Sequence, residues 1–255
     1  MWTPSRGRIE NSNMFRFMRE RGLDTWLDLH RWSVDHVEEF WSAIVEFGEV
    51  DFSKAATKVI NQPGDMTTAR FFEDGELSFP AHVLRHTGSR AAIVFRGENG
   101  VRTEISFDEL RARVAEAAAG LRAAGVVKGD RVAAFLPNCP EAIIAMLGAT
   151  SLGAIWSSCS PDFGINGVVD RFGQIRPKVL IAADGYFYNG KRFDSLDAVR
   201  GVLDRIDSIQ TTVIVPFTGA EFDVNGIRGA MSWDRLLVPG AEPDFRPMPF
   251  NHPLY

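Results

Sequence analysis

The chain has 255 residues, of which 45% are hydrophobic and 24% are charged, as in an ordinary globular protein with a well-buried core. Its net charge of −5 argues against nonspecific binding to nucleic acid, which needs a basic face. Two cysteines are too few for a disulfide framework, and no apolar run is long enough to span a membrane. The first residues contain no apolar segment typical of a secretory signal, so we expect a cytoplasmic protein.

Residues 1–85 show helical patterns without alternating strands. Short patterns at residues 11–21 and 22–30 precede a clearer one, in which Ser33 is the predicted cap and Gly48 the predicted end. The following residues, up to Phe79, are predicted to be irregular. We therefore predict a helical extension over residues 1–85, whose many aromatic side chains serve packing.

Residues 86–217 alternate between strand and helix patterns. Apolar runs at residues 91–96 and 101–105 flank Glu98-Asn99-Gly100, which indicates a hairpin. Ser106 and Glu109 have the spacing of a capping box, and they predict a helix that continues to Gly125. A second predicted helix covers residues 195–206, and a strand covers residues 211–216.

The centre of this region is a β-α-β-α-β pattern. Apolar runs at residues 131–136, 154–158 and 178–182 are separated by two helical patterns, the first opened by Asn138 and Pro140 and the second ended by Pro177. This spacing is typical of parallel strands joined by right-handed crossovers. We predict an α/β fold with a mostly parallel sheet and flanking helices, Rossmann-like over residues 86–217. Residues 218–255 are predicted to be a connecting segment.

One polar loop lies where ligands bind in such folds. Ser160, Pro161 and Asp162 follow the middle strand of the pattern. In open α/β sheets, ligands bind outside the carboxyl ends of the strands. The same loop also fits a simple turn of small polar residues in which Asp162 caps the next helix, and both interpretations stay open.

A second loop candidate is a near-match to the phosphate-binding P-loop. Residues 185–191 read G-x-x-x-x-G-K between a predicted strand and a predicted helix. A true P-loop needs Ser or Thr next, and Arg192 stands there instead; three aromatic residues also occupy the loop. We therefore predict an exposed loop that turns at Asn189-Gly190, whose Lys191 or Arg192 either meets a phosphate or faces solvent.

Other catalytic signatures are absent from the sequence. No G-x-G-x-x-G follows a strand, no H-E-x-x-H occurs, and the five histidines are scattered. We therefore predict no catalytic residue and no metal ligand. Cys139 and Cys159 are predicted to be reduced and structural; because Cys139 stands at a helix start, its thiol pKa is the one expected to be lowered.

Four segments together resemble the acetoacetyl-CoA synthetases, a branch of the AMP-forming acyl-CoA ligase (adenylate-forming) superfamily. The resemblance covers essentially the whole chain, and it is carried by WTPSRGRIENSNMFRF, RWSVDHVEEFWSAIVEF, GDRVAAFLPNCPEAIIAMLGATSLGAIWSSCSPDFGINGVVDRFGQIRPKVLIA and YFYNGKRFDSL. It implies that acetoacetate and ATP form an acyl-adenylate and pyrophosphate, and that coenzyme A then displaces AMP. ATP and coenzyme A are thus the expected substrates, with Mg²⁺; small molecules are the expected partners, without nucleic acid or membrane.

The resemblance also implies a ligand site. In related short-chain enzymes, the loop matching Ser160, Pro161 and Asp162 lines the coenzyme A nucleotide. The loop matching residues 188–191 supplies basic groups to its phosphates. Lys191 matches one of those basic positions, whereas Tyr188 occupies the other.

The resemblance further implies a longer enzyme. A Ser/Thr/Gly-rich phosphate loop, the adenine and ribose motifs, and a small domain with a catalytic lysine should follow a segment like Asn251-His252-Pro253-Leu254-Tyr255. We expect this chain to be the N-terminal part of an acetoacetate–CoA ligase, inactive by itself and prone to self-association through exposed surface. The alternatives are a non-catalytic binding or interaction module and a ligase for another short-chain acid.

Overall fold

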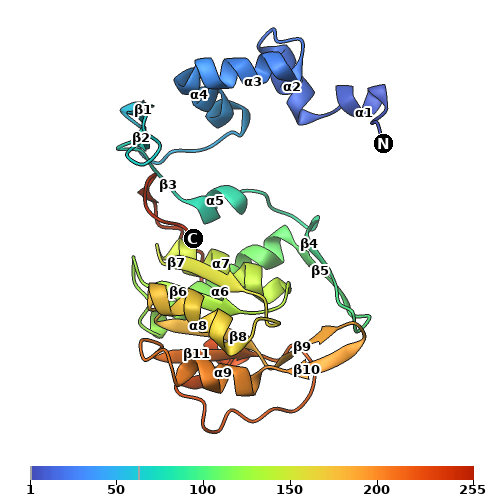
Figure 1. Ribbon diagram of the computed structural model, residues 1–255, viewed down its shortest axis with the longest axis vertical. Helices are drawn as coiled ribbons and strands as arrows, with labels where there is room; N and C mark the ends of the chain where they lie inside the picture. Colours follow the sequence, from blue (N-terminus) through green and yellow to red (C-terminus); the bar gives the residue numbers. More distant parts are fainter. Residues whose placement is uncertain (1, 63) are drawn as a thin grey trace. The chain divides into compact units, whose positions relative to one another are not determined.

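The computed structural model describes residues 2–62 and 64–255 of the chain. Within these residues the chain divides into two compact units (Figure 1). The first unit contains the residues up to Leu77 together with Pro249–Asn251, and the second contains Ser78–Met248 and His252–Tyr255. The first unit is therefore assembled from two stretches that are distant in the sequence.

The first unit is mainly helical. Its α1, α2 and α3 begin at side-chain caps from Ser5, Ser12 and Thr25, whose oxygens accept hydrogen bonds from backbone N–H groups. The buried ring of Phe17 packs edge-on or tilted against the rings of Trp32, Phe40 and Phe47. The elements are α1 (Arg6–Glu10), α2 (Asn13–Glu20), α3 (Trp26–Asp35), α4 (Val37–Phe47), β1 (Lys58–Asn61), β2 (Arg70–Glu73) and β3 (Glu76–Leu77).

Two details of this unit differ from the prediction. Ser33 lies inside α3, where its hydroxyl donates to the carbonyl of His30, and α4 begins after His36. The apolar pattern continues across His36, where α3 ends and α4 begins. The pattern alone therefore predicted one helix starting at Ser33 and not two helices that meet at His36. The segment predicted to be irregular contains the antiparallel pair β1–β2, in which Ile60 pairs with Phe71. These four-residue strands are too short for a clear alternating pattern.

The second unit contains the predicted α/β fold. Strands β12, β11, β8, β6 and β7 lie side by side in that order, and all neighbouring pairs are parallel. The elements are α5 (Phe79–Val83), β4 (Ala91–Arg96), β5 (Arg102–Ser106), α6 (Phe107–Ala123), β6 (Arg131–Phe135), α7 (Pro140–Ser151), β7 (Ile155–Cys159), α8 (Ile165–Ile175), β8 (Val179–Ala183), β9 (Gly185–Tyr188), β10 (Lys191–Asp194), α9 (Leu196–Leu203), β11 (Thr211–Val215), β12 (Ala230–Ser232) and α10 (Trp233–Leu236); β13 (Met248–Pro249) follows.

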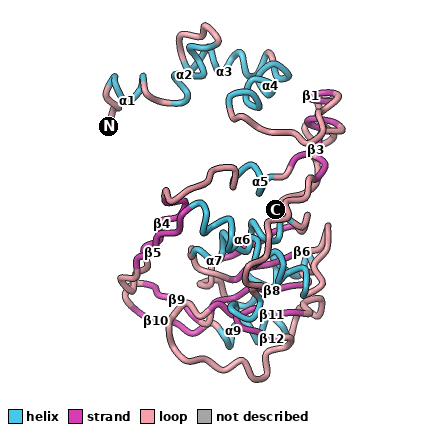
Figure 2. Tube along the Cα trace, turned by 180° about the vertical axis from the view of Figure 1, so that it is seen from behind, coloured by secondary structure: helices cyan, strands magenta, loops and turns pink. Residues whose placement is uncertain are grey.

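Helices cover both faces of this sheet (Figure 2). The side chains of β6 alternate, so that Val132 and Ala134 join one apolar core while Ala133 and Phe135 join the other. Helices α6, α7 and α10 contribute to the first core, and α8 and α9 contribute to the second. Because both faces are buried, the strands read as continuous apolar runs, which is why the sequence located them.

The helix starts after β6 and β7 are one or two residues later than predicted. Cys139 rather than Asn138 is the N-cap of α7, because Pro140 stands at its first turn. Gly164 is the N-cap of α8, so the prediction that Asp162 caps this helix is wrong. Neither helix has a side-chain capping bond. The polar residues of both loops are therefore not used by the helix ends.

Residues 185–194 form an antiparallel hairpin rather than the predicted loop. Strands β9 and β10 pair from Gly185 with Asp194 to Tyr188 with Lys191. Asn189 and Gly190 make the turn, and their φ angles of 50° and 72° suit a two-residue hairpin connection. A flat hairpin cannot wrap a phosphate as a P-loop does. Among the helices that the structure describes, none has the length and apolar character required to cross a membrane.

Candidate functional site

A cavity of about 460 Å³ opens at the carboxyl ends of the parallel strands. The connection after β6 leads to α7 on one face of the sheet, and the connection after β7 leads to α8 on the other. The two connections therefore diverge at the point where such sheets bind ligands. The cavity is lined by Phe95, Arg96, Gly97, Glu98, Leu136, Pro137, Asn138, Ala142, Ser158, Cys159, Ser160, Pro161, Asp162, Tyr186, Phe187, Tyr188 and Phe217.

The loop after β7 contributes three of the predicted site residues. Ser160, Pro161 and Asp162 all line the cavity. Pro161 is buried, whereas the side chains of Ser160 and Asp162 are exposed and free to meet a ligand. The next residue, Phe163, donates its N–H to the Ser160 carbonyl at 3.2 Å, and its ring lies 4.2 Å from the guanidinium carbon of Arg171. The loop is thus fixed at its far end while its polar groups face the opening.

The β9–β10 hairpin forms another wall of the cavity. It carries the two remaining predicted site residues, Tyr188 and Lys191, of which only Tyr188 lines the cavity. Tyr188 lines the cavity, whereas Lys191, its partner in the hairpin, and the neighbouring Arg192 lie on the hairpin outside the lining. Both basic side chains are exposed, as predicted. The hairpin begins at the buried Asp184, whose carboxylate accepts hydrogen bonds from the N–H groups of Phe217 and Thr218 at 2.8 and 3.0 Å. These two bonds tie the segment after β8 to the segment after β11.

The third wall was missed by sequence reasoning. The β4–β5 hairpin brings Arg96 and Glu98 to the cavity, and the N–H of Gly190 donates to the Glu98 carboxylate at 3.2 Å. The rings of Phe95 and Phe187 each lie 6.2 Å from the ring of Phe217. The sequence predicted the β4–β5 hairpin but not its contact with the β9–β10 turn, because Glu98 and Gly190 are 92 positions apart.

Burial raises the pKa of both thiols. It raises the pKa of Cys139 to about 12, with the negative charge of Glu141 adding to the effect. Burial likewise raises the pKa of Cys159, which lines the cavity, to about 11. The expectation that the start of α7 lowers the pKa of Cys139 is therefore wrong, because the thiol is only 3% exposed. Both cysteines are free, and neither is suited to act as a nucleophile.

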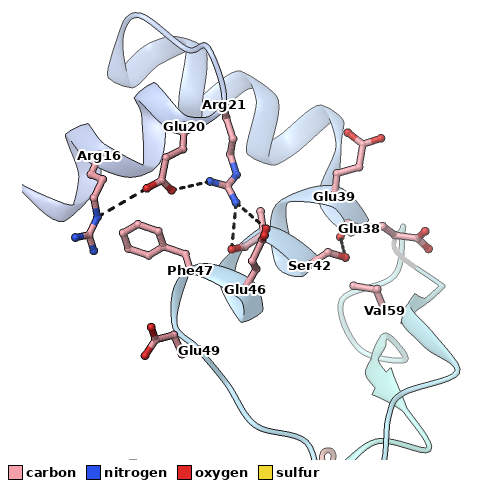
Figure 3. A pocket seen from close by; sticks show the side chains of 11 residues that line it. Arg16, Glu20, Arg21, Glu38, Glu39, Ser42, Glu46, Phe47, Glu49 and Val59 are labelled. Carbon is pink, nitrogen blue, oxygen red and sulfur yellow. Dashed lines mark hydrogen bonds and ion pairs between the residues drawn. The ribbon is translucent and has the colours of Figure 1, made fainter.

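A larger cavity, of about 1040 Å³, lies in the first unit (Figure 3). Residues of α2, α4 and β1 line it, and Figure 3 shows Arg21 reaching across to the carboxylates of Glu20 and Glu46. The N–O distances of these two ion pairs are both 3.5 Å. The guanidinium of Arg21 also lies 4.0 Å from the ring of Phe17. These groups satisfy one another and hold α2 against α4.

The structure offers no protein cluster for a metal ion in the part of the chain that it describes. No group of three or more His, Cys, Asp or Glu side chains has a suitable arrangement there. The lining of the cavity after β7 combines aromatic rings, four side-chain hydroxyls, two carboxylates and one guanidinium.

Comparison with known proteins agrees with this architecture. Residues 80–244 match the AMP-binding enzyme family, and residues 26–82 match the acetyl-coenzyme A synthetase N-terminus. The whole chain is 44% identical to 40% of an acetoacetyl-coenzyme A synthetase from Rhizobium meliloti (strain 1021), and 35% identical to 40% of an acetoacetyl-CoA synthetase from Xenopus tropicalis.

A solved structure gives the same result. The acetoacetyl-CoA synthetase from Streptomyces lividans superposes with a TM-score of 0.90 at 35% identity, over 99% of this chain and 40% of that one. The chain thus spans about 40% of the length of these relatives and corresponds to their N-terminal part. It belongs to the AMP-binding enzyme family.

Proposed function

We propose that this chain is the N-terminal part of an AMP-forming acetoacetate–CoA ligase, and that the cavity after β7 binds the nucleotide of coenzyme A. The observation that carries the proposal is the position of Ser160, Pro161, Asp162 and Tyr188 around one cavity. The cavity lies at the carboxyl edge of a sheet that superposes closely on an acetoacetyl-CoA synthetase. Its volume of about 460 Å³ is in the usual range for small-molecule sites.

The reaction proceeds in two transfers. A carboxylate oxygen of acetoacetate attacks the α-phosphorus of ATP, and pyrophosphate leaves with the electron pair of the broken P–O bond. The coenzyme A sulfur then attacks the acyl carbon of the adenylate, and AMP leaves while the thiol proton is lost to solvent. ATP is bound in the first transfer and coenzyme A in the second.

The residues of this chain contribute to binding and orientation rather than to bond breaking. The proposal assigns the Ser160 hydroxyl and the Asp162 carboxylate, which line the cavity, to hydrogen bonds with the adenine or the free 2′-hydroxyl of the coenzyme A nucleotide, and Tyr188 to contact with its aromatic base. Anchoring the distant nucleotide positions the thiol for attack, which lowers the entropic cost of the second transfer. The chain therefore contributes binding groups and no catalytic residue.

The proposal is tested on the full-length protein with two assays. Acetoacetate-dependent ATP–pyrophosphate exchange reports the first transfer, and coenzyme A-dependent formation of AMP and thioester reports the second. We expect both activities, with Asp162→Ala and Ser160→Ala raising the KM for coenzyme A while leaving exchange unchanged. Exchange that is absent with every acid, or variants that affect exchange alone, would contradict the proposal.

A second candidate is a ligase for another short acid. It is favoured by the 30% identity, over 91% of this chain, to a malonamoyl-CoA synthetase, vrtB, from Penicillium aethiopicum. Comparing kcat/KM for acetoacetate with that for acetate, propionate, butyrate and malonamate decides between the two. A protein that binds coenzyme A but exchanges pyrophosphate with none of these acids is instead a binding module.

A further inference from the structure

One basic side chain lines the cavity after β7. Among the residues that the structure describes there, Arg96 is the only Lys, Arg or His in the lining. It is the last residue of β4, and its side chain is exposed. Lys191 and Arg192, which the sequence singled out for the same task, lie outside the lining. The one cationic residue of the lining therefore comes from β4.

Arg96 occupies an unfavourable position in the β4–β5 pair, opposite a second positive charge. Its cross-strand partner in the β4–β5 hairpin is Arg102, and like charges directly opposite one another are destabilising. Arg102 is neutralised by an ion pair with Glu104. Among residues 2–62 and 64–255, no carboxylate forms an ion pair with Arg96. A cation that is opposed by another cation and left without an internal anion is a feature typical of a ligand site.

The loop that follows Arg96 is held in place by its own hydrogen bonds. The N–H of Gly97 donates to the Val101 carbonyl at 2.9 Å, and the N–H of Val101 donates to the Asn99 side chain at 3.2 Å. The bond from Gly190 to Glu98 then joins this loop to the β9–β10 turn. The backbone of Arg96 therefore stands at the end of an ordered strand, so that only its side chain has to be ordered on binding.

The other charges of the lining increase the importance of Arg96. Glu98 is acidic, so a phosphate near it would meet repulsion. Tyr188, which occupies a position where the family resemblance implies a basic group, brings no charge to offset that of Glu98. A guanidinium presents a planar fork of donors that suits the oxygens of a phosphate.

We propose that Arg96 binds a phosphate group of coenzyme A and thereby sets the specificity of the cavity for a phosphorylated thiol. This inference rests on the proposed function for the identity of the ligand. The phosphate belongs either to the 3′-phosphoribosyl group or to the diphosphate of coenzyme A. The two are chemically alike, and the experiment separates them.

The experiment measures the Kd of coenzyme A and of 3′-dephospho-coenzyme A for the full-length protein by calorimetry. Arg96→Gln removes the charge, Arg96→Lys retains it, and Arg102→Gln is the control from the opposite strand outside the lining. We expect Arg96→Gln to raise the Kd of coenzyme A by about 10-fold or more, as for loss of a charge-assisted hydrogen bond. The Kd of Arg96→Lys should lie between those of the wild type and Arg96→Gln. Arg102→Gln should change the Kd less than about 2-fold.

The outcomes are distinct. If Arg96→Gln raises the Kd of coenzyme A alone, Arg96 binds the 3′-phosphate. If it raises the Kd of both ligands equally, Arg96 binds the diphosphate. Unchanged Kd values for both ligands would overturn the inference, as would an equal loss in Arg102→Gln. Removing one of two opposed cations should not lower the unfolding temperature, which separates lost binding from lost folding.

Failure of the inference is distinguishable from failure of the proposed function. Acetoacetate-dependent pyrophosphate exchange by the wild type, measured without coenzyme A, reports the proposed reaction independently of the Kd values. Wild-type protein that lacks exchange but binds coenzyme A through Arg96 would refute the proposed reaction alone. Wild-type protein with full exchange and an Arg96-independent Kd would refute the inference alone.

Discussion

The thiols of Cys139 and Cys159 have pKa values of about 12 and about 11, because both side chains are buried. Only the thiolate reacts with alkylating agents. We therefore expect iodoacetamide to label neither cysteine in the native protein between about pH 7 and about pH 9. Intact mass after treatment is the measurement, with urea-unfolded protein as the control that gains two labels. Fast labelling of native Cys139 would mean that the helix start, and not burial, controls its pKa.

The exposed charge of Lys191 should act on coenzyme A from outside the cavity. Lys191→Glu reverses a charge beside Tyr188, and we expect the KM for coenzyme A to rise about 2- to 10-fold while the KM for ATP is unchanged. Because the interaction is solvent-exposed, the effect should shrink at high salt. The matched control is Lys128→Glu, which reverses another exposed charge in the loop before β6. An equal change in both variants would remove Lys191 from the site.

Asp130 is the residue whose ionisation should affect stability. Partial burial raises its pKa, but hydrogen bonds from Lys178 and from the Val127 N–H outweigh this and lower the pKa below its ordinary value. Its distance to the Lys178 ammonium is 2.9 Å. Asp130→Asn should therefore lower the free energy of unfolding by about 1–3 kcal/mol at neutral pH.

The pH dependence of this loss has a definite sign. A carboxylate with a lowered folded-state pKa stabilises the protein fully above its unfolded pKa, about 3.9, and loses that contribution as pH falls through the folded value. The difference between the wild type and Asp130→Asn in urea unfolding should thus be largest at neutral pH and vanish in acid. The control is Asp197→Asn, whose ion pair with Arg200 is exposed. A constant difference at all pH values would show that the charge of Asp130 is not responsible.

At the scale of elements, the β9–β10 hairpin depends on Gly185. A Cβ atom there would collide with the carbonyl oxygen of Phe193 on the facing strand. Gly185→Ala should therefore lower the free energy of unfolding by about 1–3 kcal/mol. It should also raise the KM for coenzyme A, since Tyr188 moves with the hairpin. Thermal unfolding and the KM for coenzyme A are the measurements. Gly173→Ala, on α8 with open space around it, should be neutral or stabilising.

The sequence predicted the central strands well, for a physical reason. Strands β6, β7 and β8 lie within one residue of the predicted runs, because strands buried on both faces are continuously apolar. The order of the strands was not predicted, since β8 lies between β6 and β11 through contacts that no local pattern encodes. The β9–β10 hairpin did carry a local signal: Asn189-Gly190 is the strongest short hairpin motif, and the P-loop comparison obscured it.

The candidate site was predictable only in part. Ser160, Pro161 and Asp162 follow a recognisable strand, so their position at its carboxyl end follows from the fold. Arg96 was not singled out, because it ends an unremarkable hairpin strand and reaches the cavity through tertiary placement. The N-cap roles of Asn138 and Asp162 were predicted wrongly, since both residues lie in loops ahead of the actual helix starts.

At the scale of the whole molecule, we expect a polypeptide limited to residues 1–255 not to catalyse ATP–pyrophosphate exchange with acetoacetate. Its one G-x-x-x-x-G-K segment is a hairpin, whose pairing directs its backbone groups to the facing strand and not to a phosphate. Adenylation requires groups that hold the triphosphate and offset its charge. The measurement is exchange by purified polypeptide whose mass is verified to end at Tyr255. Robust exchange would contradict the assignment of roles made above.

Because Pro249–Asn251 belong to the first unit, this unit cannot be completed until these late residues have been synthesised. The side chain of Asn251 exchanges hydrogen bonds with the backbone of Phe71, across 180 residues, and Phe250 covers the ring of Phe72. At about 5–20 residues per second, a ribosome needs roughly 10–40 s to translate the residues between these partners. During that interval Phe72 lacks its cover, while the strands of the second unit are being synthesised. The first unit is therefore begun first, but it is completed only near the end of synthesis.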